Sequence, residues 1–461
     1  MIRIANSTTI ETRRLMHIAL PLIAAYSSEF AMFVTTKMVV GKLGYLELAA
    51  TGISGGLSFE LNVILMGLLS IVGVLCAQSV GAGDNQQVGI IVKQGFIVSL
   101  LVGVPATVVV WNLDLVLIWT GQDPQVTALS IPYLKHLSGF MLPLLFFAVL
   151  RNFVSALSRP HMVMIISVIA VGVNYVLTIW LVHGGLGVPS MGLAGAGLAT
   201  SIVSWLMFFG LLFLVYRTED LRGYGLFQKG WKLDFSYCSE IMRLGVPVAA
   251  LVFLEAGLFT ASSVLSGIIG AETLAAYEIV LAWFGLPFVI ALGLAEATMI
   301  RVAHGVGSRQ FVNARKSGML GMGIGIGILT VLIVIPIGLP EYIIGFFISQ
   351  GSPGFSIVSQ LATHFLWIGA IFQVFDGLQA VAARALRSYK DNIVPLWIAT
   401  FGYWVLGIGG GSVMAFWLNM GGAGLWWGLA MGLTAAGSLL AWRFHRLSLR
   451  YMMANAQPEA V

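Results

Sequence analysis

Acidic residues inside long apolar segments are the side chains of this sequence that are best placed to do chemistry. Glu255 is the tenth residue of the apolar run 246–269, and Asp376 lies centrally within 365–383. Ionisable groups at such depth are costly in a membrane and mark sites that bind or move ions. A carboxyl group in a low-dielectric site can hold a proton near neutral pH, and a cation entering that site favours the ionised form. The alternative for each residue is a structural ion pair or a hydrogen bond to a neighbouring helix.

Other polar and aromatic residues are candidates for the same site or for a cavity beside it. Phe372, Asp376 and Gln379 share one face on helical geometry. Glu278 is a third candidate for cation coupling, and its alternative is a plain hydrogen-bonding role. The candidate cavity residues are Glu29, Thr35, Lys37, Asn174, Phe259, Tyr277, Trp283, Phe372 and Gln379. The aromatic members could offer cation–π contacts, or they are ordinary packing.

Two of these candidates, Glu29 and Lys37, carry opposite charges in one apolar segment. Glu29 either lines the cavity or pairs with Lys37, two turns further on, or with a neighbouring helix. Lys37 is expected to be paired, or to extend its ammonium group towards the membrane surface.

The elements that carry these residues must lie in lipid. Hydrophobic residues make up 58% of the 461-residue chain, charged residues 9%, and the mean hydropathy is +0.94. Segments rich in Leu, Ala and Gly without strand-like alternation favour helices over a barrel. We predict twelve membrane helices, near 15–40, 48–78, 88–112, 133–155, 161–183, 193–216, 240–267, 273–303, 314–337, 361–384, 393–417 and 422–444.

An internal repeat organises these helices into two halves. Positions at one fixed offset carry the same residue type, as in Pro21 and Pro247, Glu29 and Glu255, and Gly44 and Gly270. Both halves hold six helices in the same direction, which indicates a parallel repeat about an axis along the membrane normal. We predict an all-α membrane protein of two pseudo-symmetric six-helix bundles. The N-terminal lobe is 1–217, a cytoplasmic loop is 218–239, and the C-terminal lobe with a short cytoplasmic tail is 240–461.

The basic residues predict the orientation of the helices. On this helix count, most of the 24 Lys and Arg residues fall at one side, and Arg384, Arg387 and Lys390 follow the tenth segment there. The positive-inside rule therefore predicts that both termini are cytoplasmic. The basic pI near 9.2 reflects this topology, so we expect a lipid bilayer and no nucleic acid as partner.

Several chemistries lack their residues in this sequence. Cys76 is in an apolar segment and Cys238 in a polar loop, so we expect no disulfide. The seven histidines show no metal-ligand spacing, and there is no Gly-rich loop ending in Gly-Lys-Ser/Thr for a nucleotide. Protease motifs are absent as well. We expect neither an enzyme nor a bound cofactor or resident metal.

Several motifs together resemble the multidrug and toxic-compound extrusion (MATE) family, in its bacterial NorM-like branch. They follow the family's order along nearly the whole chain. These motifs are FVTTKMVVGKLG (33–44), AQSVGAGD (77–84), LAGAGLAT (193–200), LGVP (244–247), GLAEA (293–297), RVAH (301–304), FQVFDGLQ (372–379) and RSYKD (387–391).

The resemblance implies a bacterial inner-membrane antiporter, acting as a monomer, that expels drugs and dyes, mostly cationic and amphipathic, in exchange for protons or sodium ions. The family's cation-coupling carboxyls fall here on Glu255 and Asp376, where a sodium ion is the alternative to a proton. Thr35 stands where the family usually has Asp, and Glu278 stands where it usually has Gln. Phe372 stands where a Tyr is frequent, and this replacement removes one oxygen donor, which disfavours sodium. The alternative function is a flippase for lipid-linked precursors on a related fold, which needs basic residues in its cavity.

Overall fold

Helices form nearly all of the regular structure, because in hydrocarbon every backbone N–H and C=O group must be satisfied within its own segment. The computed structural model describes residues 2–185, 187–228, 231–348 and 354–455. Within these ranges there is no strand, and an isolated β-bridge joins Gly185 and Val188. Twelve helical stretches of the described chain are long and apolar enough to cross a membrane. They coincide with the twelve predicted segments, so the predicted all-α membrane fold is confirmed.

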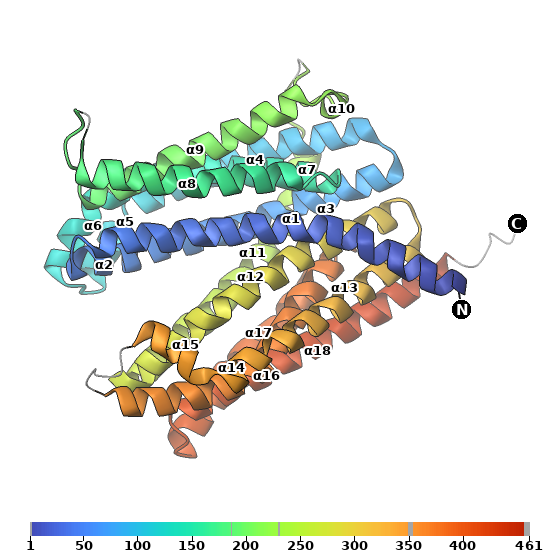
Figure 1. The fold of residues 1–461 in the computed structure, drawn as a ribbon. Helices are drawn as coiled ribbons and strands as arrows, with labels where there is room; N and C mark the ends of the chain where they lie inside the picture. Colours follow the sequence, from blue (N-terminus) through green and yellow to red (C-terminus); the bar gives the residue numbers. More distant parts are fainter. Residues whose placement is uncertain (1, 186, 229–230, 349–353, 456–461) are drawn as a thin grey trace, which may run out of the picture. The chain divides into compact units, whose positions relative to one another are not determined.

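The first repeat supplies six of these stretches (Figure 1). Short breaks and changes of helix type divide some of them into two or three elements. The elements are α1 (Ile2–Gly41), α2 (Tyr45–Ala50), η1 (Thr51–Gly55), α3 (Gly56–Ala82), α4 (Asn85–Trp111), α5 (Leu113–Trp119), α6 (Pro124–Leu137), η2 (Ser138–Phe140), α7 (Met141–Ala156), α8 (His161–His183), α9 (Leu193–Arg217) and α10 (Glu219–Arg222).

The second repeat supplies the other six, with a π-helical stretch in the eleventh. Here α16 packs against both α12 and α18. The elements are α11 (Phe235–Ile269), α12 (Ala271–Gly307), α13 (Phe311–Leu332), α14 (Val334–Gly338), α15 (Pro340–Phe347), α16 (Phe355–Arg387), α17 (Ile393–Thr400), η3 (Phe401–Gly410), η4 (Val413–Trp417) and α18 (Gly422–Ala454).

Glycine allows the π-helix η3 to lie directly on α18. A Cβ atom on Gly428 of α18 would lie 2.3 Å from Gly411 Cα and 2.4 Å from the Gly407 carbonyl oxygen. No side chain fits there, and small residues are what let two helix backbones approach this closely in a membrane. The contact fixes η3, and with it the fully buried Tyr403.

The chain divides into two compact units at positions that the repeat relates. One unit is Ala24–Ala249, and the other comprises the chain up to Ile23 together with the chain from Ala250. The two points of division, after Ile23 and after Ala249, are equivalent positions of the repeat. The start of each repeat's first long helix thus belongs to the unit built mainly from the other repeat. The predicted lobes, 1–217 and 240–461, stay a prediction about which parts move.

A buried ion pair holds the start of α1 within its unit. Arg301 of α12 donates from Nε and Nη2 to the two carboxylate oxygens of Glu11, both at 2.8 Å. Ser317 of α13 also donates to Glu11 Oε1 at 2.8 Å. Further along α1, Ile23 lies so close to Gly293 of α12 that a Cβ there would be 2.7 Å from the Ile23 backbone nitrogen.

Neutral hydrogen bonds hold the start of α11 within the other unit. Gln87 Nε2 donates to the Tyr237 hydroxyl at 3.0 Å. Gln94 accepts at its Oε1 from the Asp234 backbone N–H at 3.1 Å and from the Cys238 thiol at 3.2 Å. The Cys238 thiol is therefore hydrogen-bonded to an amide side chain.

Replacing Glu11 with Gln should lower the free energy of unfolding by about 3 kcal/mol, because it leaves the largely buried Arg301 without its counter-charge. Asp220→Asn is the matched control, since Asp220 forms an exposed pair with Arg159 and its loss should cost less than about 1 kcal/mol. Unfolding of the purified protein in detergent micelles measures both. Equal losses for the two variants would contradict this interpretation.

Candidate cation-coupling site

Asp376 lies in the interior of α16 and belongs to a row of polar side chains. It is 5% exposed, and Gln373 and Gln379, three residues to either side, are 3% and 1% exposed. Within the described part of the chain, Asp376 Oδ1, Gln379 Oε1 and the Tyr403 hydroxyl are buried and have no hydrogen-bond partner. The Tyr403 hydroxyl, on η3, lies beside the Gln379 side chain. Buried polar atoms are normally paired, so this set of oxygens suits a proton or a small cation.

Glu255 of α11 brings a second carboxyl to this row. It is half-buried, and it interacts electrostatically with Asp376 as well as with Arg384 and Arg387. Tyr403 interacts with both carboxyl groups. The two acids that the sequence singled out are thus brought together from helices that are far apart along the chain. Two like charges close together in a low-dielectric interior disfavour the doubly ionised state.

The positive charge of Arg384 acts on both Glu255 and Asp376. Arg384 also forms an ion pair with Glu296 of α12. Arg384 Nε lies 3.6 Å from Glu296 Oε2, and Arg384 also donates from Nη1 to the Ala380 carbonyl at 3.4 Å. The sequence placed Arg384 among the basic residues that follow the tenth segment. The structure instead puts it inside α16, where its charge reaches both Glu255 and Asp376.

Three residues of this centre were not predicted from the sequence as part of it: Glu296, Arg384 and Tyr403. Arg384 follows Asp376 after close to two helical turns, and this spacing is a usable signal. Glu296 is itself an acid deep in an apolar segment, within the GLAEA motif (293–297), and this charge at depth is a usable signal. No local pattern marks Tyr403, because its place in the site depends on how η3 is packed against α18.

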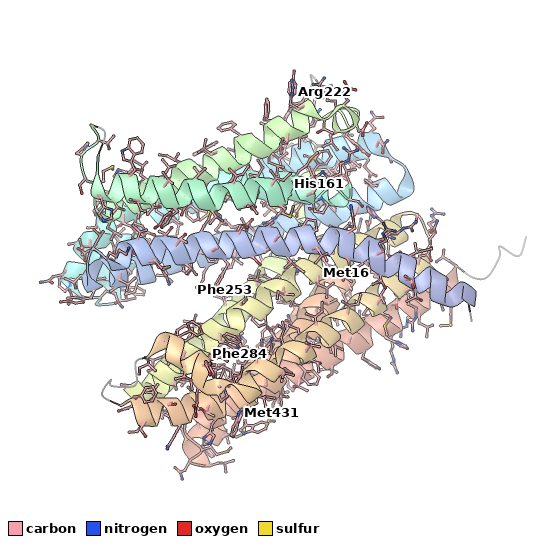
Figure 2. All side chains as sticks on the ribbon, viewed as in Figure 1. Met16, His161, Arg222, Phe253, Phe284 and Met431 are labelled. Carbon is pink, nitrogen blue, oxygen red and sulfur yellow. The ribbon has the colours of Figure 1, made fainter. Side chains whose placement is uncertain are left out.

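Several predicted cavity residues form an aromatic cluster in the unit that contains α16. The Phe372 ring is within about 6 Å of the rings of Phe259, Phe284 and Trp426, centroid to centroid. Phe284 of α12 is labelled in Figure 2. Tyr277 is fully buried against Trp426 and donates its hydroxyl to the Phe259 carbonyl at 3.0 Å. These contacts are those of a packed core, and a role in a cavity stays a prediction.

Glu278 and Trp283 lie at the margin of this cluster. Glu278 is exposed and accepts a hydrogen bond from the Ser263 hydroxyl at 2.7 Å. Trp283 packs partly buried against the core, and its indole N–H has no partner in the described residues. Within the described chain, Glu278 does not interact with Glu255 or Asp376. Its coupling role stays a prediction.

The predicted residues of the first repeat have partners of a different kind. Arg151 of α7 donates from Nη1 to both carboxylate oxygens of Glu29, at 3.0 and 3.2 Å, and its guanidinium lies over the Tyr26 ring. The sequence left open whether Glu29 pairs with Lys37 or with a residue of a neighbouring helix. In the structure it pairs with Arg151 of the neighbouring helix α7. Lys37 Nζ lies 4.2 Å from the centre of the Phe33 ring.

The remaining two predicted residues of this repeat are hydrogen-bonded. Thr35 donates to the Ala31 carbonyl within α1 at 2.9 Å. Asn174 of α8 is buried and accepts from the Thr36 hydroxyl at 3.0 Å. In the residues that the structure describes, no group of three or more His, Cys, Asp or Glu side chains could hold a metal ion.

Comparison with known proteins decides the family. The MatE family profile matches residues 21–181 and again residues 247–413, so the two matches begin at the repeat-related residues Pro21 and Pro247. The chain belongs to the MatE family. The double match is independent support for the internal repeat, and it confirms the resemblance found in the motifs. Membership also confirms the expectation of a membrane transporter rather than an enzyme.

Curated relatives and solved structures cover almost the whole MatE chain. The "Probable multidrug resistance protein NorM" of Brucella suis is 33% identical over 428 residues, which is 92% of this chain and 91% of the relative. "Multidrug resistance protein NorM" of Burkholderia vietnamiensis is 34% identical over 438 residues, 95% and 93% of the two chains. The eukaryotic MATE transporter AtDTX14 superposes with a TM-score of 0.86 at 23% identity, covering 97% and 99%. At that identity the structure supports the fold alone.

The two repeat-related glutamates should respond differently to removal of their charge. Glu29→Gln should lower the free energy of unfolding by about 3 kcal/mol, because it removes the carboxylate that pairs with the buried Arg151, whose side chain is 7% exposed. The double variant Glu29→Gln/Arg151→Met should recover much of that loss, because it removes both charges. Glu255→Gln should cost less than Glu29→Gln, since Glu255 has no such bidentate clamp in the described chain. Unfolding in detergent micelles tests this ranking, and the reverse order would contradict it.

Proposed function

We propose that this chain is a secondary active antiporter that exports amphipathic, mostly cationic compounds in exchange for protons by alternating access. Glu255 and Asp376 are the coupling carboxyl groups. The names of the relatives, multidrug resistance proteins, support a drug-export function. The observation that carries the proposal is the set of buried oxygens, Asp376 Oδ1, Gln379 Oε1 and the Tyr403 hydroxyl, that make no hydrogen bond of good geometry in the described chain.

The charges around this set support exchange of one monovalent cation. The interacting groups are three carboxyls, of Glu255, Asp376 and Glu296, and two guanidinium groups, of Arg384 and Arg387. When all are ionised, the carboxylates outnumber the guanidinium groups. A bound proton reduces this excess of negative charge, which is costly in a low-dielectric interior. Loss of that proton leaves the group negatively charged, and a negative charge attracts a cationic cargo.

Competition between proton and cargo then couples their movements. A site that cannot hold both at once must release one to bind the other, and the shift between inward- and outward-open states follows the differential affinity of each. Each charge that moves across 100 mV contributes about 2.3 kcal/mol, which corresponds to roughly a 50-fold concentration ratio. One proton exchanged for a neutral compound is therefore enough to drive export.

Sodium is the alternative coupling ion, since the acceptors are all oxygens, which hard cations prefer. Phe372 stands where a tyrosine would add another oxygen, and its ring is packed in the aromatic cluster. This missing ligand favours the proton.

The remaining parts of the proposal concern the setting. We infer that the protein lies in the bacterial inner membrane with both termini cytoplasmic, from the positive-inside distribution, and that it acts as a monomer. The residues 1–217 and 240–461 are the lobes whose relative motion alternates access, and residues 218–239 link them. The flippase alternative needs free bases, and the Arg151 guanidinium is instead bound by Glu29.

Asp376→Asn should abolish proton-driven accumulation of ethidium in everted membrane vesicles, because an amide cannot exchange a proton. Glu341→Gln is the matched control: it also removes one acidic charge, but Glu341 is exposed on α15, so accumulation should be unchanged. Both proteins must be present in the membrane at the wild-type level. Retained accumulation in Asp376→Asn would remove this residue from the coupling role.

The coupling ion is tested in proteoliposomes with imposed gradients. With an acidic lumen and no sodium, the purified protein should accumulate ethidium, and nigericin in potassium buffer should stop accumulation by collapsing the pH gradient. A sodium-loaded lumen at equal pH on both sides, with a protonophore present, should give no accumulation. The opposite pattern would assign sodium as the coupling ion.

A further inference from the structure

One face of α1 carries aromatic and charged side chains that the coupling centre does not use. Tyr26, Glu29, Phe33 and Lys37 follow one another at intervals of three, four and four positions, so they share one helix face. Contacts with other helices of the Ala24–Ala249 unit confirm this, since Tyr26 and Glu29 meet Arg151 of α7. Phe33 and Lys37 continue the same face towards the end of α1.

A pair of stacked rings lies on this face and already holds a cation. The rings of Phe33 on α1 and Phe59 on α3 are stacked, with centroids 5.6 Å apart and an angle of 27° between their planes. The ammonium group of Lys37 lies 4.2 Å from the Phe33 centroid. This is within the distance at which a ring face attracts a cation. Phe33 thus makes a cation–π contact with a lysine about one helical turn further along α1.

The residue next to Phe59 along α3 is acidic. Glu60 is exposed, and within the described residues it makes no hydrogen bond or ion pair. It is well inside the span Tyr45–Ala82, several helical turns from either end. A charged side chain at such a depth is found facing water or a protein interior and not hydrocarbon. This part of α3, including the 45% exposed Phe59, therefore borders a water-accessible path.

We propose that Phe33, Phe59 and Glu60 form a subsite for the positive charge of the cargo, and that the Lys37 ammonium occupies it when cargo is absent. The cargo class is an amphipathic organic cation with a bulky, weakly hydrated charge, such as ethidium. Lys37 is then a specificity residue: it competes with the cargo cation for the Phe33 ring face. The inference rests on the proposed export function. It concerns the recognition of the cargo, at residues other than those proposed to bind the proton.

The chemistry of the two cations explains why displacement is feasible. A primary ammonium is compact and strongly hydrated, whereas a large aromatic cation gains from leaving water. A tethered ammonium loses little entropy by staying near the ring, so it blocks weakly held ions while a bulky aromatic cation displaces it. The competing explanation is that Lys37 only extends towards the membrane surface, in which case its removal has no effect on cargo affinity.

Equilibrium binding of ethidium to the purified protein, followed by its fluorescence in detergent micelles without any ion gradient, tests the subsite. Lys37→Met should lower the Kd roughly five- to tenfold, on the scale of one desolvated cation–π contact. Phe33→Leu should raise the Kd by a similar factor. Glu60→Gln should raise the Kd for ethidium and leave binding of an uncharged amphipathic dye unchanged. Lys42→Met is the control, since Lys42 is exposed in the turn after α1, and it should match wild type.

An unchanged or raised Kd in Lys37→Met, or an unchanged Kd in Phe33→Leu, would overturn the subsite. Lys37→Gln serves as second variant if Lys37→Met does not elute as a single species in size-exclusion chromatography. The binding assay is independent of coupling. Wild-type protein that binds ethidium but moves none in vesicles would refute the proposed export function while the Kd ranking still decides the subsite.

Discussion

A carboxyl group inside a membrane protein has to be neutralised by a fixed base, by a cation or by a proton. Glu29 is neutralised by Arg151 and Glu11 by Arg301, in each case through two hydrogen bonds to one guanidinium group. In the described chain the negative charge of Asp376 is compensated by Arg384 at longer range, and Arg384 also pairs with Glu296. We propose that the neutralising partner of Asp376 is therefore exchanged. The difference between a carboxyl bound by a guanidinium group and one without such a partner is the basis of the proposed coupling role.

Duplication makes this difference visible within one chain. Glu29 and Glu255 occupy the same repeat position, so each lies at the equivalent point of the first long helix of its repeat. Ser158 and Lys390 end the corresponding helices α7 and α16 with the same backbone conformation and are 232 positions apart, so the counterpart of Arg151 is Ala383. In the second repeat a base is thus missing at the place where the first repeat binds its glutamate, and the next residue, Arg384, pairs with Glu296. The first repeat keeps a structural ion pair, whereas the second brings together two acids, for which we propose exchange of a cation.

The sequence was sufficient for the helices and the repeat, and it singled out the two acids that the structure brings together. Each of these rests on a local property such as apolar length, identity at a fixed offset or charge at depth. It was insufficient wherever the outcome depends on how a helix is rotated about its axis. Phe372 shares a face with Asp376 in projection, yet its ring is packed among Phe259, Phe284 and Trp426. Tyr403 has no charge or motif to mark it. It reaches the site because η3 lies against α18 through glycine contacts that a single sequence does not reveal.

The repeat also relates the fastenings of α1 and α11. Glu11 and Tyr237 are repeat counterparts, so equivalent positions hold the start of each helix, one by a carboxylate and the other by a phenol. In both units a glycine also lets the first long helix approach another helix closely. For α1 this glycine is Gly293 on α12, and for α11 it is Gly245 on α11 itself. Charge-assisted hydrogen bonds are roughly twice as strong as neutral ones. The start of α1 is therefore held by the stronger individual hydrogen bonds, and the start of α11 by neutral ones.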